Sequence, residues 1–347
     1  MGQMQIYGAD TQLDRLSKMG DPLEKINSAI DWEIFREPIE NRIRKENYSK
    51  GGRPPYDSIF MFKIIMLQDW NNTSDENTEY LINDRLSFQR FLGMELGEKA
   101  PDRNTIWNFK EQLGDEGMRE LFDIFNEMLE TSGIITYKGS IVDASFVDVP
   151  RQRNTRKENE TIKDGGIPEE WQTSEQKAKL EQKDTDARWA KKNDEAHYGY
   201  KDHVKVDEES KIITNFSVTS ANVHDSKEIV NLIDEKDEIV YGDSAYVGKE
   251  LQEAIKEKNP EVDLQINEKG KKNNPLNDEQ KASNRKKSQV RSRVEHVFGD
   301  ITNSMNGIYI RTIGLVRAKR EICGINLAYN IKRAVYLMTS KNSKRIA

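Results

Sequence analysis

The chain has 347 residues, 35% of them hydrophobic and 33% charged, with a formal net charge of −6. This length accommodates two domains, and no apolar run reaches the roughly 18 residues that a membrane span needs. A single cysteine, Cys323, excludes an intramolecular disulfide and a cysteine-based zinc cluster, and the N-terminus shows no signal-peptide pattern. The composition therefore indicates a highly charged soluble protein.

Residues 1–133 are predicted to form an all-helical N-terminal domain. Helices are expected over 23–44, from Asp57 to about Trp70, through Leu81, and on both sides of Gly114. Their ends are marked by polar caps and glycine stops, namely Asp57, the capping-box pair Thr73 and Glu76, Asp102, Gly114 and Gly133.

Residues 134–310 are predicted to form a mixed α/β domain. Strands are expected at 141–147, 198–206, 212–218, 238–241 and 262–266, because these stretches are apolar or alternate in polarity. A capping-box pattern of Asp225 and Glu228 predicts a helix through Leu232, and another helix is expected over 248–258. Residues 151–195 carry dense charges of both signs, which predicts a surface insertion that is partly helical or disordered.

The positive charge is concentrated in the C-terminal part of the chain. From Lys281 to Ala347 there are 15 basic and three acidic residues, a net charge of +12, so that the rest of the chain carries −18. Residues 311–347 are expected to form a basic helical segment. A local basic surface on an acidic chain can bind a phosphate backbone while the whole protein stays soluble, although a solvated basic face is the alternative.

Three acidic residues fit a two-metal phosphoryl-transfer site. Asp143 lies mid-strand, Asp243 ends another strand, and Glu295 lies in a late helix. A carboxylate at the centre of a strand costs several kcal/mol unless it is paired or binds metal, and two cations about 3.5–4 Å apart can clamp both reacting oxygens. The alternatives are a capping role for Asp243 and an ion pair of Glu295 with Arg291. Nearby Asp148, at a strand end, is expected to be structural.

Four motifs give the chain a family resemblance: DARWAKKNDEAHYGYK, VTSANVHDSK, YGDSAYVG and RSRVEHVFG. Together they resemble transposases of the IS5 type within the IS4-like DDE group, and the order of elements resembles a ribonuclease-H-like fold. The resemblance implies a DNA transposase that cuts at insertion-element ends and joins the freed 3′-hydroxyl to target DNA. It assigns Asp143, Asp243 and Glu295 as catalytic ligands of two Mg²⁺ ions, with Mn²⁺ as a possible substitute. It further implies double-stranded DNA carrying terminal inverted repeats, a homodimer on DNA, and a prokaryotic cytoplasm near the nucleoid.

Two further groups of residues are candidates for DNA contact. The basic side chains around Glu295 are expected to bind phosphates, and they are Arg285, Lys286, Lys287, Arg291 and Arg293. Asn104, Asn108 and Lys110, on the helix that starts near residue 104, are of types that read base edges, although an ordinary bundle helix is the alternative. Trp189 and Lys191 are further candidates for lining a DNA path, although a structural role is the alternative.

One departure from the wider group concerns the signature around Glu295. Arg291 matches it, but Ser288 and Thr302 stand where the group has Tyr and Lys. This difference weakens the case for a hairpin intermediate. Three other classes compete with a transposase: a nuclease of the same fold that does not join DNA, an inactive DNA-binding descendant, and a metal phosphatase acting on small substrates.

Overall fold

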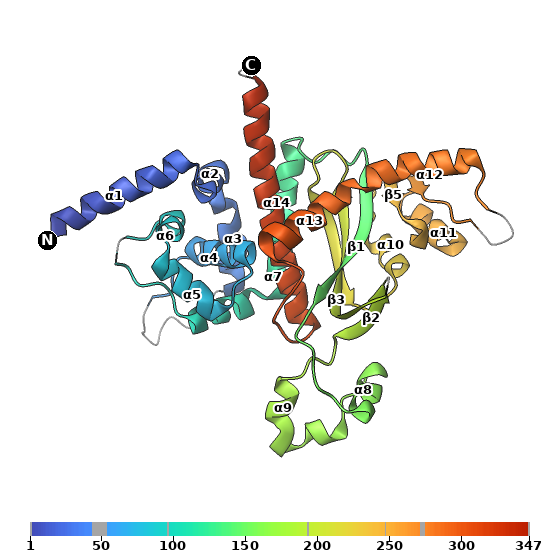
Figure 1. Cartoon of the computed structure of the whole chain (residues 1–347), viewed down its shortest axis with the longest axis horizontal. Coiled ribbons are helices and arrows are strands. Elements are labelled where there is room, and N and C mark those ends of the chain that lie inside the picture. Colours follow the sequence, from blue (N-terminus) through green and yellow to red (C-terminus); the bar gives the residue numbers. More distant parts are fainter. Residues whose placement is uncertain are drawn as a thin grey trace. The chain divides into compact units, whose positions relative to one another are not determined.

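The computed structural model describes residues 2–43, 54–95, 97–192, 194–246, 248–270 and 275–345. It divides into two compact units, one comprising Met1–Glu127 with Gly324–Ala347 and the other Met128–Cys323. The first unit is helical, whereas the second contains a mixed α/β sheet domain (Figure 1). Among the described helices, none combines the length and the apolar character needed to cross a membrane.

The helical unit consists of α1 (Gly2–Met19), α2 (Pro22–Ala29), a 3₁₀ turn η1 (Trp32–Phe35), α3 (Arg36–Ile43), α4 (Ser58–Asn71), α5 (Asp75–Asp84), α6 (Leu86–Leu92), most of α7 (Arg103–Thr131) and the second half of α14 (Leu315–Arg345). The helix predicted over 23–44 is broken because Ile30 ends α2 in extended conformation and Asp31 caps the next turn. Gly114 has a φ of 68° and interrupts α7, which confirms the predicted stop.

The caps of this unit are mostly those expected from sequence. Asp57 accepts hydrogen bonds from the backbone N–H groups of Ile59 and Phe60 at 3.0 Å, as predicted. The capping box predicted at Thr73 is wrong, because Ser74 has the extended backbone of an N-cap and accepts from the N–H of Asn77. A cap needs both a suitable side chain and an extended backbone. Thr73 and Ser74 both offer the side chain, so the sequence alone does not show which of the two is the cap.

Helix α4 forms the centre of the helical unit. It is buried along most of its length. Its Phe62 ring packs against Trp32 and Phe35, which in turn pack against Phe91 and Phe125 respectively. The second half of α14 belongs to the same core, because the indole N–H of Trp70 donates to the carbonyl of Ala328 at 2.8 Å. Long-range packing, rather than chain order, thus places the end of the chain with its beginning.

The α/β unit contains a six-stranded sheet with β1 near its centre. The strands are β1 (Ser140–Asp148), β2 (Arg188–Lys192), β3 (Glu195–Asp207), β4 (Ile213–Ser220), β5 (Ile239–Gly242) and β6 (Asp263–Ile266). Their order is β2-β3-β1-β5-β6, and β4 also pairs with β3. Strand β1 runs antiparallel to β3 and parallel to β5, and β5 runs parallel to β6. The predicted strands are therefore all present, and β2 is an addition.

The segment predicted as a surface insertion has two parts. Residues 156–181 form α8 (Arg156–Lys163), α9 (Lys177–Glu181) and short 3₁₀ turns, which confirms the partly helical prediction. Residues 188–192 instead form strand β2, so the prediction was wrong there. Buried Asp184 fixes the chain before β2, because it accepts from the Tyr200 hydroxyl at 2.7 Å and from the backbone of Ala187 at 2.9 Å. The charged sequence of β2 did not indicate a strand, because the pairing with β3 that stabilises it cannot be seen in the local sequence.

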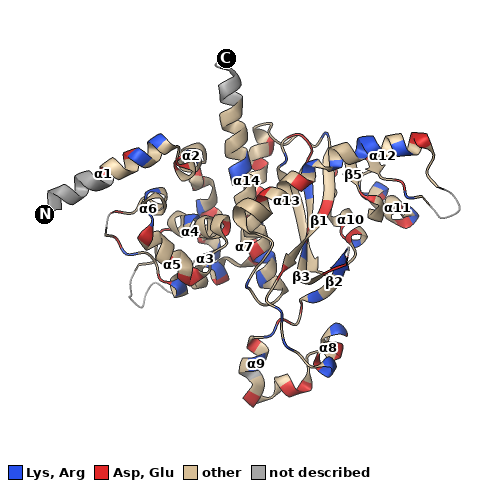
Figure 2. Cartoon of the chain, viewed as in Figure 1, with Lys and Arg blue, Asp and Glu red and all other residues tan. Residues whose placement is uncertain are grey.

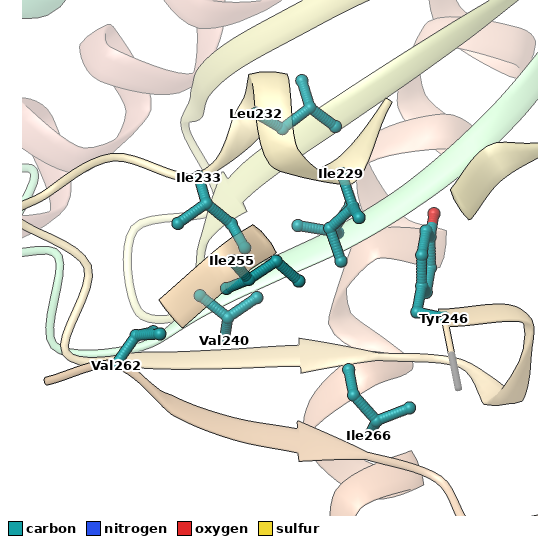
Figure 3. Close-up of a cluster of buried hydrophobic side chains, with 9 residues drawn as sticks. Ile229, Leu232, Ile233, Val240, Tyr246, Ile255, Val262 and Ile266 are labelled. Atoms are coloured by element: carbon teal, nitrogen blue, oxygen red, sulfur yellow. The ribbon is translucent and has the colours of Figure 1, made fainter. Parts of the chain in front are cut away.

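One face of β1, β5 and β6 is covered by α10 (Ile229–Leu232) and α11 (Lys249–Lys258). The apolar cluster between them is drawn in Figure 3 and includes Val142, Ile229, Val240, Ile255 and Ile266. Asp225 does not cap this region, contrary to the prediction. His224 caps the 3₁₀ turn η5 (Asp225–Lys227), while the Asp225 carboxylate pairs with Lys201 at 2.8 Å.

Candidate active site

Asp143 occupies the middle of the central strand. Its side chain is 16% exposed, and one carboxylate oxygen lies 3.7 Å from Nε of Arg291. The other oxygen accepts from the N–H of Ala144 at 2.8 Å. Burial raises the pKa of Asp143, and the charge of Asp243 adds to this rise, whereas Ala144 and Arg291 oppose it. The positive charge of Arg291 thus does not fully compensate the burial of the Asp143 carboxylate.

Asp243 follows directly on the neighbouring strand. The parallel register pairs Ser140 with Val240 and Ile141 with Tyr241, so continuing it by two residues brings Asp143 and Asp243 to the same level. Asp243 lies just after β5 ends, and its carboxylate accepts from the N–H of Ala245 at 2.7 Å. It therefore caps the 3₁₀ turn η6 (Ser244–Tyr246), and this does not exclude a second role for the carboxylate.

Glu295 lies in the first turn of α13 (Arg293–Met305) and is exposed. The helix predicted around it is divided at Ser292, and Arg291 is the last residue of α12 (Asp278–Arg291). Arg291 forms its ion pair with Asp143. Among the described residues, no three His, Cys, Asp or Glu side chains are close enough to hold a metal ion, so the three carboxylates do not converge on one point here.

Tyr246 is a neighbour of this site that the sequence did not single out. Its ring is 2% exposed and packs at the edge of the apolar cluster (Figure 3). Burial raises the pKa of Tyr246, and the nearby carboxylates of Asp143, Asp225 and Asp243 raise it further. The sequence could have indicated this neighbour by its position three residues after Asp243, because a short turn after a strand brings a side chain back toward the strand end.

The predicted phosphate-binding residues fall into two groups. Figure 2 shows Lys and Arg along α12, where Arg285 and Lys286 are exposed. Lys287 is partly buried and donates to the carbonyl of Ile266 at 3.0 Å. Arg293 forms an ion pair with Glu208 at 2.8 Å. Arg285 and Lys286 are thus the most accessible cations of the group.

The residues predicted to read bases are also divided. Asn104 and Asn108 are exposed on the first part of α7 and are one helical turn apart. Lys110, however, is 7% exposed, with its amine 2.5 Å from Asp75 and 3.0 Å from Gln68. Its charge is already neutralised inside the helical unit, so the structure does not favour the predicted contact of Lys110 with DNA.

Comparisons with known proteins match both parts of the chain. A transposase domain model (DUF772) matches residues 11–112, and a transposase DDE domain model matches residues 135–331. A solved structure, a cryo-EM structure of a piggyBac transposase synaptic complex with hairpin DNA, is also similar. The two chains share 12% sequence identity with a TM-score of 0.47, and the match covers 93% of this chain and 76% of the piggyBac transposase chain. Because the DDE domain model alone covers more than half of the 347 residues, the chain belongs to the transposase DDE domain family and is a DNA transposase.

Proposed function

We propose that this transposase cuts DNA at insertion-element ends and joins the freed 3′-hydroxyl to target DNA through a site built on Asp143, Asp243 and Glu295. The observation that carries the proposal is the placement of Asp143. It is a mostly buried carboxylate on the central strand, and the adjacent parallel strand delivers Asp243 at the same level. A carboxylate in that position has no structural partner that would compensate its burial fully.

The donor set fits Mg²⁺. All three side chains offer carboxylate oxygens, which are the ligands that hard divalent cations prefer. The raised pKa of Asp143 indicates a deficit of positive charge, which a bound cation would remove. When bound, two Mg²⁺ ions would supply Lewis-acid activation of the attacking oxygen and neutralise charge on the phosphate, with Mn²⁺ as a substitute.

The chain's own residues prepare the site for the phosphate. Asp143 and Asp243 repel each other, and Arg291 offsets part of that repulsion from 3.7 Å. With metal held by the carboxylates, the Arg291 guanidinium would be available to bind a phosphate oxygen and stabilise the charge that develops there. Arg291 should therefore affect the rate of cleavage more than the affinity for DNA.

The sheet order supports a ribonuclease-H-like core within this family. Three antiparallel strands, β4, β3 and β1, are followed by β5 and β6, which run parallel to β1. The IS5-type motifs support the narrower grouping, and we carry over from it a homodimer acting on terminal inverted repeats and a prokaryotic, nucleoid-associated setting. The first part of α7, with Asn104 and Asn108 exposed, would read those repeats.

A cleavage assay on labelled duplex from the flanks of this reading frame tests the site. Asp143→Asn should abolish cleavage and leave gel-shift binding nearly intact, because binding depends on basic residues elsewhere. Asp148→Asn is the matched control, since Asp148 already interacts with His197 at 3.4 Å and with the N–H of Tyr198 at 3.3 Å. Cleavage by Asp143→Asn at the wild-type rate would refute the assignment.

The same assay separates a transposase cycle from simple hydrolysis. A pre-cut DNA end with a free 3′-hydroxyl, mixed with supercoiled plasmid, should yield joined products with the wild-type protein and none with Asp143→Asn. Cut ends without joined products would favour the nuclease alternative.

A further inference from the structure

Strand β2 presents a tryptophan to solvent. Trp189 is 51% exposed, although it lies within a paired strand. Its cross-strand neighbour Tyr198 packs against it with ring centroids 5.0 Å apart and an interplanar angle of 40°. The Arg151 guanidinium lies 5.3 Å from the indole centroid, and Arg151 is held by a hydrogen bond to the carbonyl of Ala196 at 3.3 Å. The indole is thus supported on one side by protein while about half of it stays open.

Cations flank this ring. Lys191 and Lys192 follow Trp189 on β2 and are exposed, and Figure 2 shows the basic colouring of this strand. Lys191 pairs with Asp194 at 2.8 Å, so its charge is partly offset. By strand alternation Lys191 lies on the same face of β2 as Trp189 and Lys192 on the opposite face, so Arg151 and Lys191 are the cations on the side of the indole. An open aromatic ring between cations is the arrangement that binds a nucleobase together with its adjoining phosphates.

The β2–β3 hairpin shares strand β3 with the candidate active site, and the β3 partners of Trp189 and Asp143 are six residues apart. Trp189 pairs with Tyr198, and Asp143 pairs with Val204 on the same strand β3. Because alternate residues of a strand share a face, Trp189 and Asp143 lie on the same face of the sheet. The charge of Lys192 is one of those that lower the pKa of Asp143, so the end of β2 lies within electrostatic reach of that carboxylate.

We propose that β2 holds an unpaired base of the DNA strand being processed, with the base stacked on Trp189 and its neighbouring phosphates on Arg151 and Lys191. A base inside a duplex has both faces covered by its neighbours, so it cannot stack on a side chain unless the strand is opened. A purely structural role would bury the indole, as Trp171 of the preceding segment is buried to 0% exposure. This inference rests on the proposed action on DNA ends and names the part of the DNA that β2 would bind.

The test measures binding of the full-length protein to two fluorescent probes in EDTA, so that no metal-dependent cleavage occurs. One probe is a blunt duplex, and the other is the same duplex with a short unpaired 3′ extension containing 2-aminopurine. Trp189→Ala should weaken binding of the extended probe by roughly 5- to 150-fold and leave the blunt probe nearly unchanged. Wild type and Trp189→Phe should quench 2-aminopurine on binding, whereas Trp189→Ala should not.

A matched control is Tyr336→Ala. Tyr336 is 59% exposed, with the Arg333 guanidinium 5.1 Å from its ring, and it belongs to the other compact unit. This variant should bind both probes like wild type. Equal weakening of both probes by Trp189→Ala, or no weakening of either, would overturn the proposal. Because the assay contains no metal, such a result would leave the cleavage test of Asp143 unaffected.

Discussion

The buried ion pair of Lys205 and Asp237 gives the sharpest prediction about stability. The Lys205 amine lies 2.7 Å from an Asp237 oxygen, and the two side chains are 1% and 0% exposed. Lys205→Met keeps the aliphatic stem and removes the charge. Asp237 would retain the Ser140 hydroxyl at 2.6 Å and the N–H of Asp234 at 2.7 Å, but no cation.

Breaking one partner of a buried pair costs about 3–5 kcal/mol, and we expect the lower end because two neutral donors stay. For a unit of this size the thermal midpoint falls by about 2–4 °C per kcal/mol, so the expected fall is roughly 6–12 °C. Asp237 lies two residues before β5, which leads to Asp243. DNA cleavage by Lys205→Met should therefore decline as well, below the new midpoint.

Thermal unfolding of the full-length protein, followed by circular dichroism and calorimetry, measures the effect. Lys236→Met is the matched control, because Lys236 pairs with Glu130 at 2.6 Å but is 56% exposed. An exposed pair contributes about 0–1 kcal/mol, so the control should lose less than roughly 4 °C. The double variant Lys205→Met with Asp237→Leu should recover only the part of the loss caused by the uncompensated charge, because the Ser140 hydroxyl and the Asp234 N–H then lose their acceptor. If Lys205→Met behaved like Lys236→Met, the reasoning about the buried charge would be refuted.

Three other outcomes are expected. Tyr200→Phe removes a hydroxyl that donates to buried Asp184, so chemical denaturation should show a loss of about 1–3 kcal/mol, and an unchanged midpoint would contradict that bond. Burial lowers the pKa of His203 to about 4, below its unfolded value of about 6.5. The folded protein should therefore lose stability as the pH falls from about 6.5 to 4, and the His203→Gln variant should lose less over that range. Replacing exposed Arg285 and Lys286 with Ala should lower the salt slope of DNA binding by roughly 2, and an unchanged slope would make them a solvated face.

Several local features were predictable because they depend on nearby residues. The strand at Asp143 is an apolar run, the stop at Gly114 needs a positive φ, and Asp57 precedes an apolar helix as a cap should. The errors also have physical causes. Strand β2 is strongly charged and is stabilised by pairing with β3, and Lys110 looked like a surface residue because its partner Asp75 lies 35 positions earlier in the chain.

The sequence by itself therefore determined the helical and α/β regions, the strand that carries Asp143 and the family motifs, because periodicity, caps and motif order are local properties. Only the tertiary structure decided which distant residues meet. It paired Ile141 with Tyr241, so that Asp143 lies beside the end of the strand that leads to Asp243, and it placed Arg291 against Asp143. These contacts join residues about 100 positions or more apart, and they depend on the burial that the whole sheet provides.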